Sequence, residues 1–264
     1  MTSPAWSWSD RGFWAILAVL GGSYVVLIVL LLVATFWSMD ASAVWKALAS
    51  SEIRYATILS LVSCTVSTLL SLWVALPLAY ILSRRQFRGK AWIEGILDLP
   101  IVLPPLVVGI SLLILFNFLP RSLAEAVVFE IPAVILAQFT VSCAFAVRTL
   151  RVALDQIPVR FEQVALTLGA SQGQAFWTIT MPQMRRGLVA AGTLAWARSL
   201  GEFGPILVFA GSTRLRTEVL PTSIFLEMQS GNLQGMLAVS LIMIVAAAAA
   251  LLMARGFGLR GVYT

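Results

Sequence analysis

Six long apolar segments constrain the fold of this 264-residue chain more than any other feature of its sequence. They run approximately over residues 12–37, 58–82, 99–119, 131–150, 187–211 and 235–254. Each can cross the hydrocarbon core of a bilayer, which takes about 20 helical residues. Because lipid offers no partner for an open backbone, each segment is expected to be a helix. The sequence therefore predicts an all-α polytopic membrane protein with six transmembrane helices, forming one transmembrane domain over residues 1–264.

Composition agrees with a lipid environment and excludes several chemistries. Hydrophobic residues make up 59% of the chain and charged residues only 11%, whereas soluble domains carry about 25% charged residues. The chain has no histidine, so a histidine base, metal ligand or pH switch is excluded. Cys64 and Cys143 both lie in apolar segments and have no metal-site spacing. No nucleophile–base pair stands out, so we expect neither a metal site nor an enzyme.

The placement of the basic residues predicts the orientation of the bundle. If the N-terminus is cytoplasmic, 12 of the 18 Lys and Arg residues lie in inner segments, 5 lie in outer loops, and Arg198 alone lies within a span. This bias favours both termini in the cytoplasm. The first span is too long for a signal peptide and lacks a cleavage site, so we expect a retained anchor. The net charge of +6 then reflects membrane topology, and no nucleic-acid partner is needed.

The longest inner segment, residues 151–186, is called the polar loop below. Pro158 suits the first turn of a helix that ends where Gly169 can adopt a left-handed cap. Ser171 can cap a second short helix, which Pro182 is expected to end. An ordinary loop with two helical turns would show the same pattern. However, Phe176 and Trp177 are expected to be exposed, and short isolated helices are marginal in water. Docking of a soluble partner would explain both features.

The polar loop resembles the cytoplasmic loop motif of bacterial ABC importer permeases: Glu-Ala-Ala, three residues, Gly, nine residues, then Ile-x-Leu-Pro. The matching positions here are Gln163, Val164 and Ala165, then Gly169, and finally Ile179, Thr180, Met181 and Pro182. The spacing fits throughout, while three identities differ. Glu162 stands one place before the expected acid and could supply its charge, although it points in another helical direction. The resemblance covers residues 50–254, five of the six spans.

In that family the loop forms a coupling helix that seats on a separate ATPase subunit. The resemblance assigns this contact to Glu162, Gln163, Val164, Ala165, Gly169, Ala170, Ser171, Phe176, Ile179 and Pro182. No G-x-x-x-x-G-K-[ST] motif occurs in the sequence, so ATP and Mg are expected on the partner ATPase and no cofactor on this chain.

Prolines interrupt the third apolar segment, "LDLPIVLPPLVVGISLL". Pro100, Pro104 and Pro105 each remove a backbone donor, so a helix cannot be regular there. The freed carbonyls need protein or water around them, which favours a position along a translocation path. A kink packed against neighbouring helices is the alternative. Gly109 is expected to allow close helix packing.

A charged pair lies in the fifth segment, "ARSLGEFGPILVFAG". Arg198 and Glu202 are four residues apart on one helical face, and charges at this depth must face protein or water. Arg198 could attract an anion in the path, with Glu202 holding it in place. Equally, the two could form a structural ion pair. We assign Arg198, Ser199, Glu202 and Phe203 to the path or its gate, together with the three prolines.

The segments "SLGEFG", "FAG" and "RTEVLPTSIF" resemble those of permeases that import tetrahedral oxyanions, and they are most similar to those of molybdate and tungstate permeases. Pro205 departs from the small residue expected there. The resemblance implies a homodimer in a bacterial or archaeal cytoplasmic membrane, with two ATP-binding cassette subunits and an external substrate-binding protein.

The alternatives are a permease for sulfate, thiosulfate or another small solute, and a secondary carrier without an ATPase. Carriers often show two related halves with broken helices, and no such doubling is evident here. Arg214, Arg216 and Glu218 lie in the last outer loop, where they could contact the binding protein or gate, or form a solvated face.

Overall fold

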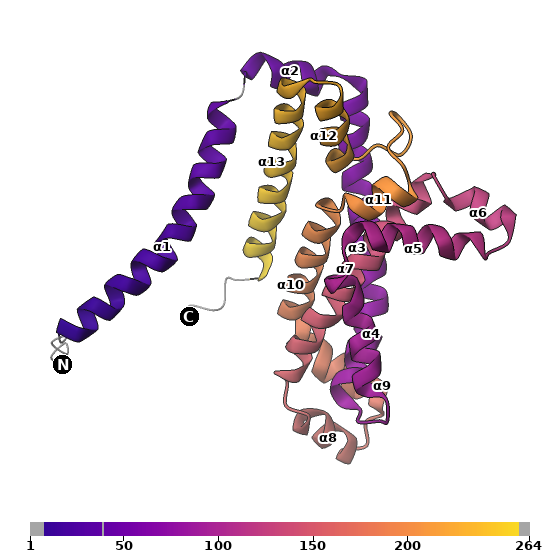
Figure 1. Cartoon of the computed structure of the whole chain (residues 1–264). Helices are drawn as coiled ribbons and strands as arrows, with labels where there is room; N and C mark the ends of the chain where they lie inside the picture. The colour runs from indigo at the N-terminus through magenta and orange to yellow at the C-terminus, as the bar shows by residue number, and fades with distance from the viewer. Residues whose placement is uncertain (1–7, 39, 259–264) are drawn as a thin grey trace.

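The computed structural model describes residues 8–38 and 40–258, and these residues form helices connected by short loops (Figure 1). The helices are α1 (Trp8–Trp37), α2 (Ala41–Ala49), α3 (Ser51–Arg84), α4 (Lys90–Val102), α5 (Pro105–Asn117), α6 (Arg121–Val127), α7 (Ile131–Asp155), α8 (Arg160–Thr167), α9 (Gln172–Ala175), the π-helical η1 (Phe176–Thr180), α10 (Met181–Leu200), α11 (Gly204–Phe209), α12 (Leu220–Gln229) and α13 (Leu233–Gly258). The all-α prediction is confirmed for this part of the chain.

Of the six predicted transmembrane helices, the structure shows four to five candidate spans. By length and composition, four helical segments of the described chain can cross a membrane: Gly12–Trp37, Ser51–Arg84, Ile131–Asp155 and Leu233–Leu252. A fifth is obtained if α4 and α5 count as one broken span. The predicted third and fifth spans, residues 99–119 and 187–211, are each divided between two helices. Residues 1–7 and 259–264 lie outside the described residues, and the orientation of the termini stays a prediction from the basic residues.

The third span breaks at its prolines. The axes of α4 and α5 differ by 113°, and Pro104 stands between the two helices. Leu103, which precedes it, is extended with a ψ of 140°, as expected for a residue before proline. Pro105 occupies the first turn of α5, where its missing N–H needs no partner. The predicted irregularity is confirmed at these positions, whereas Pro100 remains inside α4.

The centre of the bundle is the contact between α3 and α7. Small residues recur along the buried face of α3, so the two backbones can approach closely. They are Ala56, Ser60, Ser63, Ser67, Ser71, Ala75 and Ala79. The Ser71 and Ser142 hydroxyls are 2.8 Å apart, and Ser67 donates to the carbonyl of Ile135 at 3.0 Å. Side-chain hydrogen bonds therefore join α3 and α7 within their contact.

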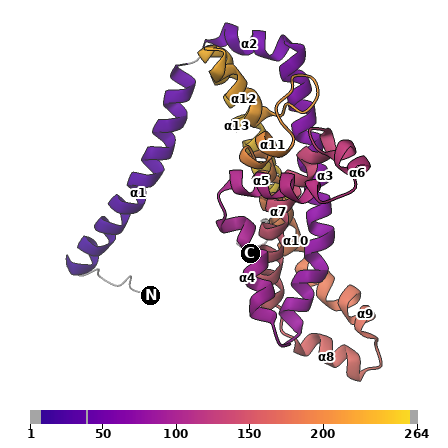
Figure 2. The ribbon, with the colours of Figure 1, turned by 45° about the vertical axis from the view of Figure 1, so that its right-hand side comes forward.

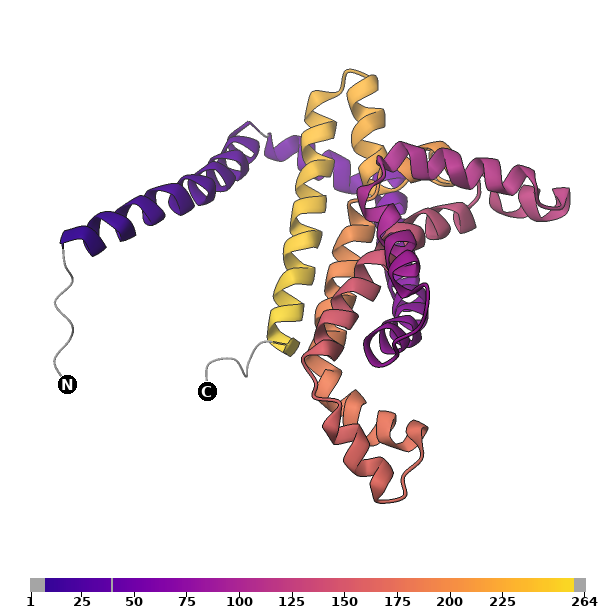
Figure 3. The same ribbon diagram turned by 60° about the horizontal axis from the view of Figure 1, so that its bottom comes forward.

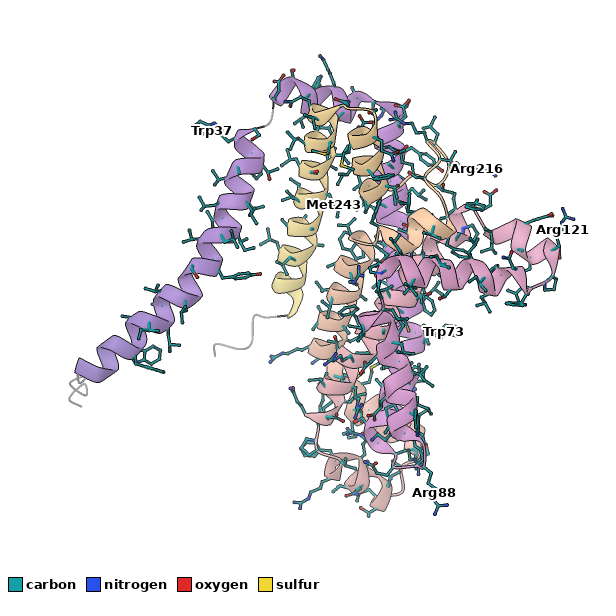
Figure 4. The ribbon with its side chains drawn as sticks, viewed as in Figure 1. Trp37, Trp73, Arg88, Arg121, Arg216 and Met243 are labelled. Atoms are coloured by element: carbon teal, nitrogen blue, oxygen red, sulfur yellow. The ribbon has the colours of Figure 1, made fainter. Side chains whose placement is uncertain are left out.

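The ends of the bundle are well separated. Helix α2 lies at one end and α8 at the other, while α10 rises from the α8–α9 end toward α11, which turns across the bundle (Figures 1 and 2). Helix α1 stands apart from the other helices in all views (Figure 3), and its apolar side chains are exposed in this single chain. Arg88 lies at the same end as α8, and Arg121 points away from the bundle on the α5–α6 arm (Figure 4).

Candidate functional site

The first part of the polar loop folds around Gly169. Helix α8 ends as the N–H of Gly169 donates to Leu166 and that of Ala170 donates to Ala165, each at 3.0 Å. These two bonds form a Schellman cap, in which the residue after the helix is left-handed. Gly169 has a φ of 88°, in that region. The predicted C-terminal cap is confirmed.

Ser171 then starts the second helical part. Its hydroxyl accepts from the backbone N–H of Gln174 at 3.2 Å, and the Gln174 side chain accepts from the Ser171 N–H at 2.8 Å. This reciprocal capping box satisfies two donors at the helix start, so the cap predicted at Ser171 is also confirmed.

Pro182 does not end this helix, contrary to the prediction. Helix α9, η1 and α10 follow one another without a break from Gln172 to Leu200. In η1 the N–H of Met181 donates to Phe176, five residues earlier. A proline ring within a regular helix would crowd the carbonyl four residues before it. The wider π-helical turn directly upstream accommodates Pro182, so the loop joins α10 rigidly.

Glu162 is the most completely bonded side chain of the polar loop. Its carboxylate accepts from Thr180 Oγ1 at 2.6 Å, from Tyr80 Oη at 2.9 Å and from Arg84 Nε at 2.9 Å. Burial alone would raise the pKa of Glu162, but hydrogen bonds from Thr180, Tyr80 and Arg84, with the Arg84 charge, hold its pKa below the usual value. The carboxylate is therefore ionised and turned inward.

The polar loop exposes several large apolar side chains among its polar ones. Leu168 is 82% exposed, Trp177 63% and Val164 57%. Gln163 and Ser171 are exposed, whereas Ala165, Ala170 and Ile179 are partly buried. Phe176 is half-buried, with its ring 4.8 Å from that of Tyr80. The prediction that Phe176 lies on the exposed face is thus wrong, because α3 supplies an aromatic neighbour; Trp177 and Leu168 take that place.

The charged pair of the fifth segment lies where α10 ends. Arg198 Nη1 and Glu202 Oε2 form an ion pair at 2.5 Å, without the alignment of a hydrogen bond. The Glu202 side chain is 1% exposed and that of Arg198 28%, so the carboxylate is the buried member of the pair. Ser199 is buried beside them, and Phe203 packs on Phe225 of α12 with ring centroids 5.5 Å apart.

The two helix breaks touch each other. A β carbon added to Gly204 would lie 2.9 Å from the Pro105 Cβ, and one added to Gly109 would lie 2.9 Å from the Pro205 Cα. Helices α5 and α11 therefore cross in close contact, with each glycine against a proline of the other helix. This confirms the packing role predicted for Gly109. Pro104 and Pro105 thus lie near the charged pair, while Pro100 precedes the bend.

The outer loop is more ordered than a solvated face. Glu218 is buried and accepts from Ser223 Oγ at 2.8 Å. Arg214 pairs with Glu227 at 3.0 Å, and Arg216 pairs with Glu130.

The sequence marked Arg84 only as a topological charge and did not indicate Tyr80 or Thr180 as partners of Glu162. These residues lie 78, 82 and 18 positions from Glu162 in sequence, so no local spacing could connect them.

These features define a polytopic helical membrane protein with two broken helices in contact and a polar helical loop at one end. The model of the family described as "Binding-protein-dependent transport system inner membrane component" matches residues 67–260. The chain belongs to this family.

Relatives and solved structures agree with this assignment. The chain is 35% identical to the molybdenum transport system permease protein of Mycobacterium tuberculosis, over 91% of this chain and 92% of that protein. It is 34% identical to a molybdate/tungstate transport system permease of Pyrococcus abyssi, over 73% and 76%, and 32% identical to a sulfate transport system permease of Escherichia coli, over 78% of each. A bacterial alginate ABC transporter has the same fold, with a TM-score of 0.75, 17% identity and coverage of 97% and 98%.

Proposed function

We propose that this chain is the membrane-spanning permease subunit of an ATP-driven importer that carries molybdate or tungstate into the cytoplasm. The observation that carries the proposal is the 35% identity to a molybdenum permease along nearly the whole of both chains. The similarity to a sulfate permease is slightly lower and covers less of both chains, so sulfate is the second candidate cargo.

We propose the following assembly, which membership of the family supports. Residues 1–264 act as one transmembrane domain, two copies enclose the path, and an external binding protein delivers the anion. Both termini and the polar loop face the cytoplasm, in agreement with the excess of inner basic residues. ATP and Mg bind two ATPase subunits, and this chain is not itself an enzyme.

The polar loop meets the ATPase through its apolar surface. Its exposed Leu168, Trp177 and Val164 have the character of an interface core, which is enriched in aromatic side chains and depleted of charge. The Schellman cap and capping box give the surface a fixed shape. This arrangement supports the docking role assigned to the residues of the motif, with Glu162 acting from inside the loop.

The path passes the contact between the two helix breaks. The Arg198 side chain is paired with buried Glu202 and is itself partly exposed, and a guanidinium matches the oxygen geometry of an oxyanion. Pro105 packs against Gly204, two residues beyond Glu202, and we assign Ser199, Phe203, Pro104 and Pro105 to the path here, with Pro100 on the approach in α4. Alternating access then opens this point to one side of the membrane at a time.

Reconstitution tests the proposal directly. The chain is co-produced with its ATPase and binding protein, and uptake of labelled molybdate into vesicles is measured with and without ATP. We expect uptake that requires ATP and is inhibited by tungstate but not by equimolar sulfate. Sulfate-inhibited uptake would transfer the assignment to the second candidate, and uptake by the chain alone under an ion gradient would refute the importer.

A further inference from the structure

Four side chains form one largely buried polar cluster at the base of the polar loop: Tyr80, Arg84, Glu162 and Thr180, called the Glu162 node. We propose that the Glu162 node is the junction through which displacement of the polar loop is passed to α3, α7 and α10. Its members are positioning residues that act through the helices they join. The inference rests on the proposed function, because it assumes that an ATPase displaces the loop.

The node joins several elements through a single ion pair. Arg84 and Glu162 side chains are only 7% and 9% exposed. Besides Glu162 of α8, Arg84 donates to the carbonyls of Leu154 and Ile157 at 3.2 Å each, at the end of α7. Thr180, which donates to Glu162, directly precedes α10. One carboxylate and one guanidinium therefore connect α3, the end of α7, α8 and the start of α10.

The charge of Glu162 is not available to a docking partner. Both carboxylate oxygens are occupied, Oε1 by Arg84 and Thr180 and Oε2 by Tyr80, and the residue is buried while Phe161 and Gln163 beside it are exposed. A buried charge of this kind contributes by fixing geometry, and its loss leaves the partner charge uncompensated.

The remainder of α8 is weakly fastened. Glu162 is the only buried residue of α8, Ala165 is partly buried, and the other six residues of the helix are exposed. The node is thus the principal anchor of α8. Beyond it, hydrogen bonds join α3 to α7, the helical run continues without a break into α10, and Arg198 lies in the last turn of α10. A displaced loop must carry these helices with it or break the node.

The test measures uptake per ATP hydrolysed in vesicles containing the full permease–ATPase complex and its binding protein, using molybdate as the probe. Glu162→Gln keeps the shape of the side chain and removes its charge. We expect the ATPase to copurify at the wild-type ratio and ATP hydrolysis to continue. Uptake per ATP should fall about tenfold, a size typical of coupling between sites.

The matched control is Glu94→Gln. Glu94 pairs with Arg151 at 3.0 Å and joins α4 to α7, outside α8, α9 and η1. The same chemical change there should leave uptake per ATP within about twofold of wild type, below typical coupling effects. An equal loss of uptake per ATP in both variants would overturn the inference, because loss of any ion pair would then uncouple ATP hydrolysis from uptake.

Thr180→Val provides a second variant in case Glu162→Gln does not fold. It removes only the 2.6 Å hydrogen bond and is nearly isosteric. Wild-type uptake per ATP in whichever variant folds would overturn the inference. Loss of the ATPase from the complex would also overturn it, because the node would then act by shaping the docking surface. If the wild-type complex fails to assemble or import, the proposed function itself fails.

Discussion

Gly109 and Pro205 meet at the crossing of α5 and α11, where a β carbon on the glycine would lie 2.9 Å from the proline Cα. The reciprocal contact of Gly204 with Pro105 lies nearby. Each helix thus has a glycine packed against a proline of the other. Two interrupted helices are held together at the point where both change direction, and the charged pair lies beside them.

Replacing Gly109 by alanine is expected to force these helices apart, because the added β carbon would meet two backbone atoms of Pro205, at 2.9 and 3.1 Å, and the Val208 Cβ at 3.0 Å. Overpacking of this kind costs about 1–3 kcal/mol, so we expect a lower Tm of the purified complex and reduced uptake. Gly95→Ala is the control, since a β carbon at Gly95 meets nothing within 4 Å. Equal Tm values for the two variants would contradict the close contact.

Arg198→Ala is expected to lower uptake about tenfold or more while the ATPase complex still assembles, because truncating one member of a buried pair costs about 2–5 kcal/mol. The variant also leaves Glu202 buried without its countercharge. Arg198→Ala combined with Glu202→Gln removes that orphaned charge. If the double variant imports molybdate normally, Arg198 serves structure alone. Arg121→Ala on the exposed α6 arm, where the arginine side chain is 92% exposed, is the surface control.

Gly169→Val should release the ATPase from the complex. The φ of 88° at this position is left-handed, and a side chain there costs about 1–2 kcal/mol, enough to distort the Schellman cap. Gly173→Ala is the control: it lies in the same loop, has equal space around it and adopts an ordinary helical φ. Copurification with the ATPase should fall for the first variant and persist for the second.

Trp177→Ala tests the apolar surface of the polar loop. Because Trp177 is largely exposed, the change should leave the Tm of the isolated permease unchanged. The Kd for the ATPase should rise about 30-fold, since truncating an interface hot spot costs 2 kcal/mol or more. Trp92→Ala provides the comparison, as Trp92 is 81% exposed on α4. A similar Kd for both variants would exclude Trp177 from the interface.

The stability of the folded protein at acidic pH should depend on Glu162. Its pKa is lowered in the folded state by Thr180, Tyr80 and Arg84, against the opposing effect of burial. A depressed pKa contributes stability that is present above the ordinary glutamate pKa and is lost as the pH falls through the lowered value. The difference in Tm between wild type and Glu162→Gln should therefore shrink on acidification through this range. A constant difference would show that protonation of Glu162 is not linked to folding.

The sequence was sufficient to predict those structural features that depend only on adjacent residues. Gly169 and Ser171 are typical cap residues, and their backbone geometry follows from their own side chains and nearest neighbours. Prolines 104 and 105 likewise predict a break, because they remove donors and restrict the preceding residue.

Features set by distant packing were not predictable in this way. The 113° bend accompanies the packing of α5 against α11, whose contacting residues are about a hundred positions apart. Pro182 is a helix breaker by propensity, yet the π-helical turn at 176–180 accommodates it. Phe176 is covered by Tyr80 and Glu162 is bonded by Arg84, both from α3. Hydropathy alone cannot place any of these contacts.

The hydroxyls between α3 and α7 have a consequence for movement within lipid. Ser67, Ser71 and Ser142 are bonded inside the pair, so tilting both helices together presents no fresh polar group to the acyl chains. Sliding one past the other would break these interhelical hydrogen bonds. We therefore expect α3 and α7 to tilt together as one rigid pair.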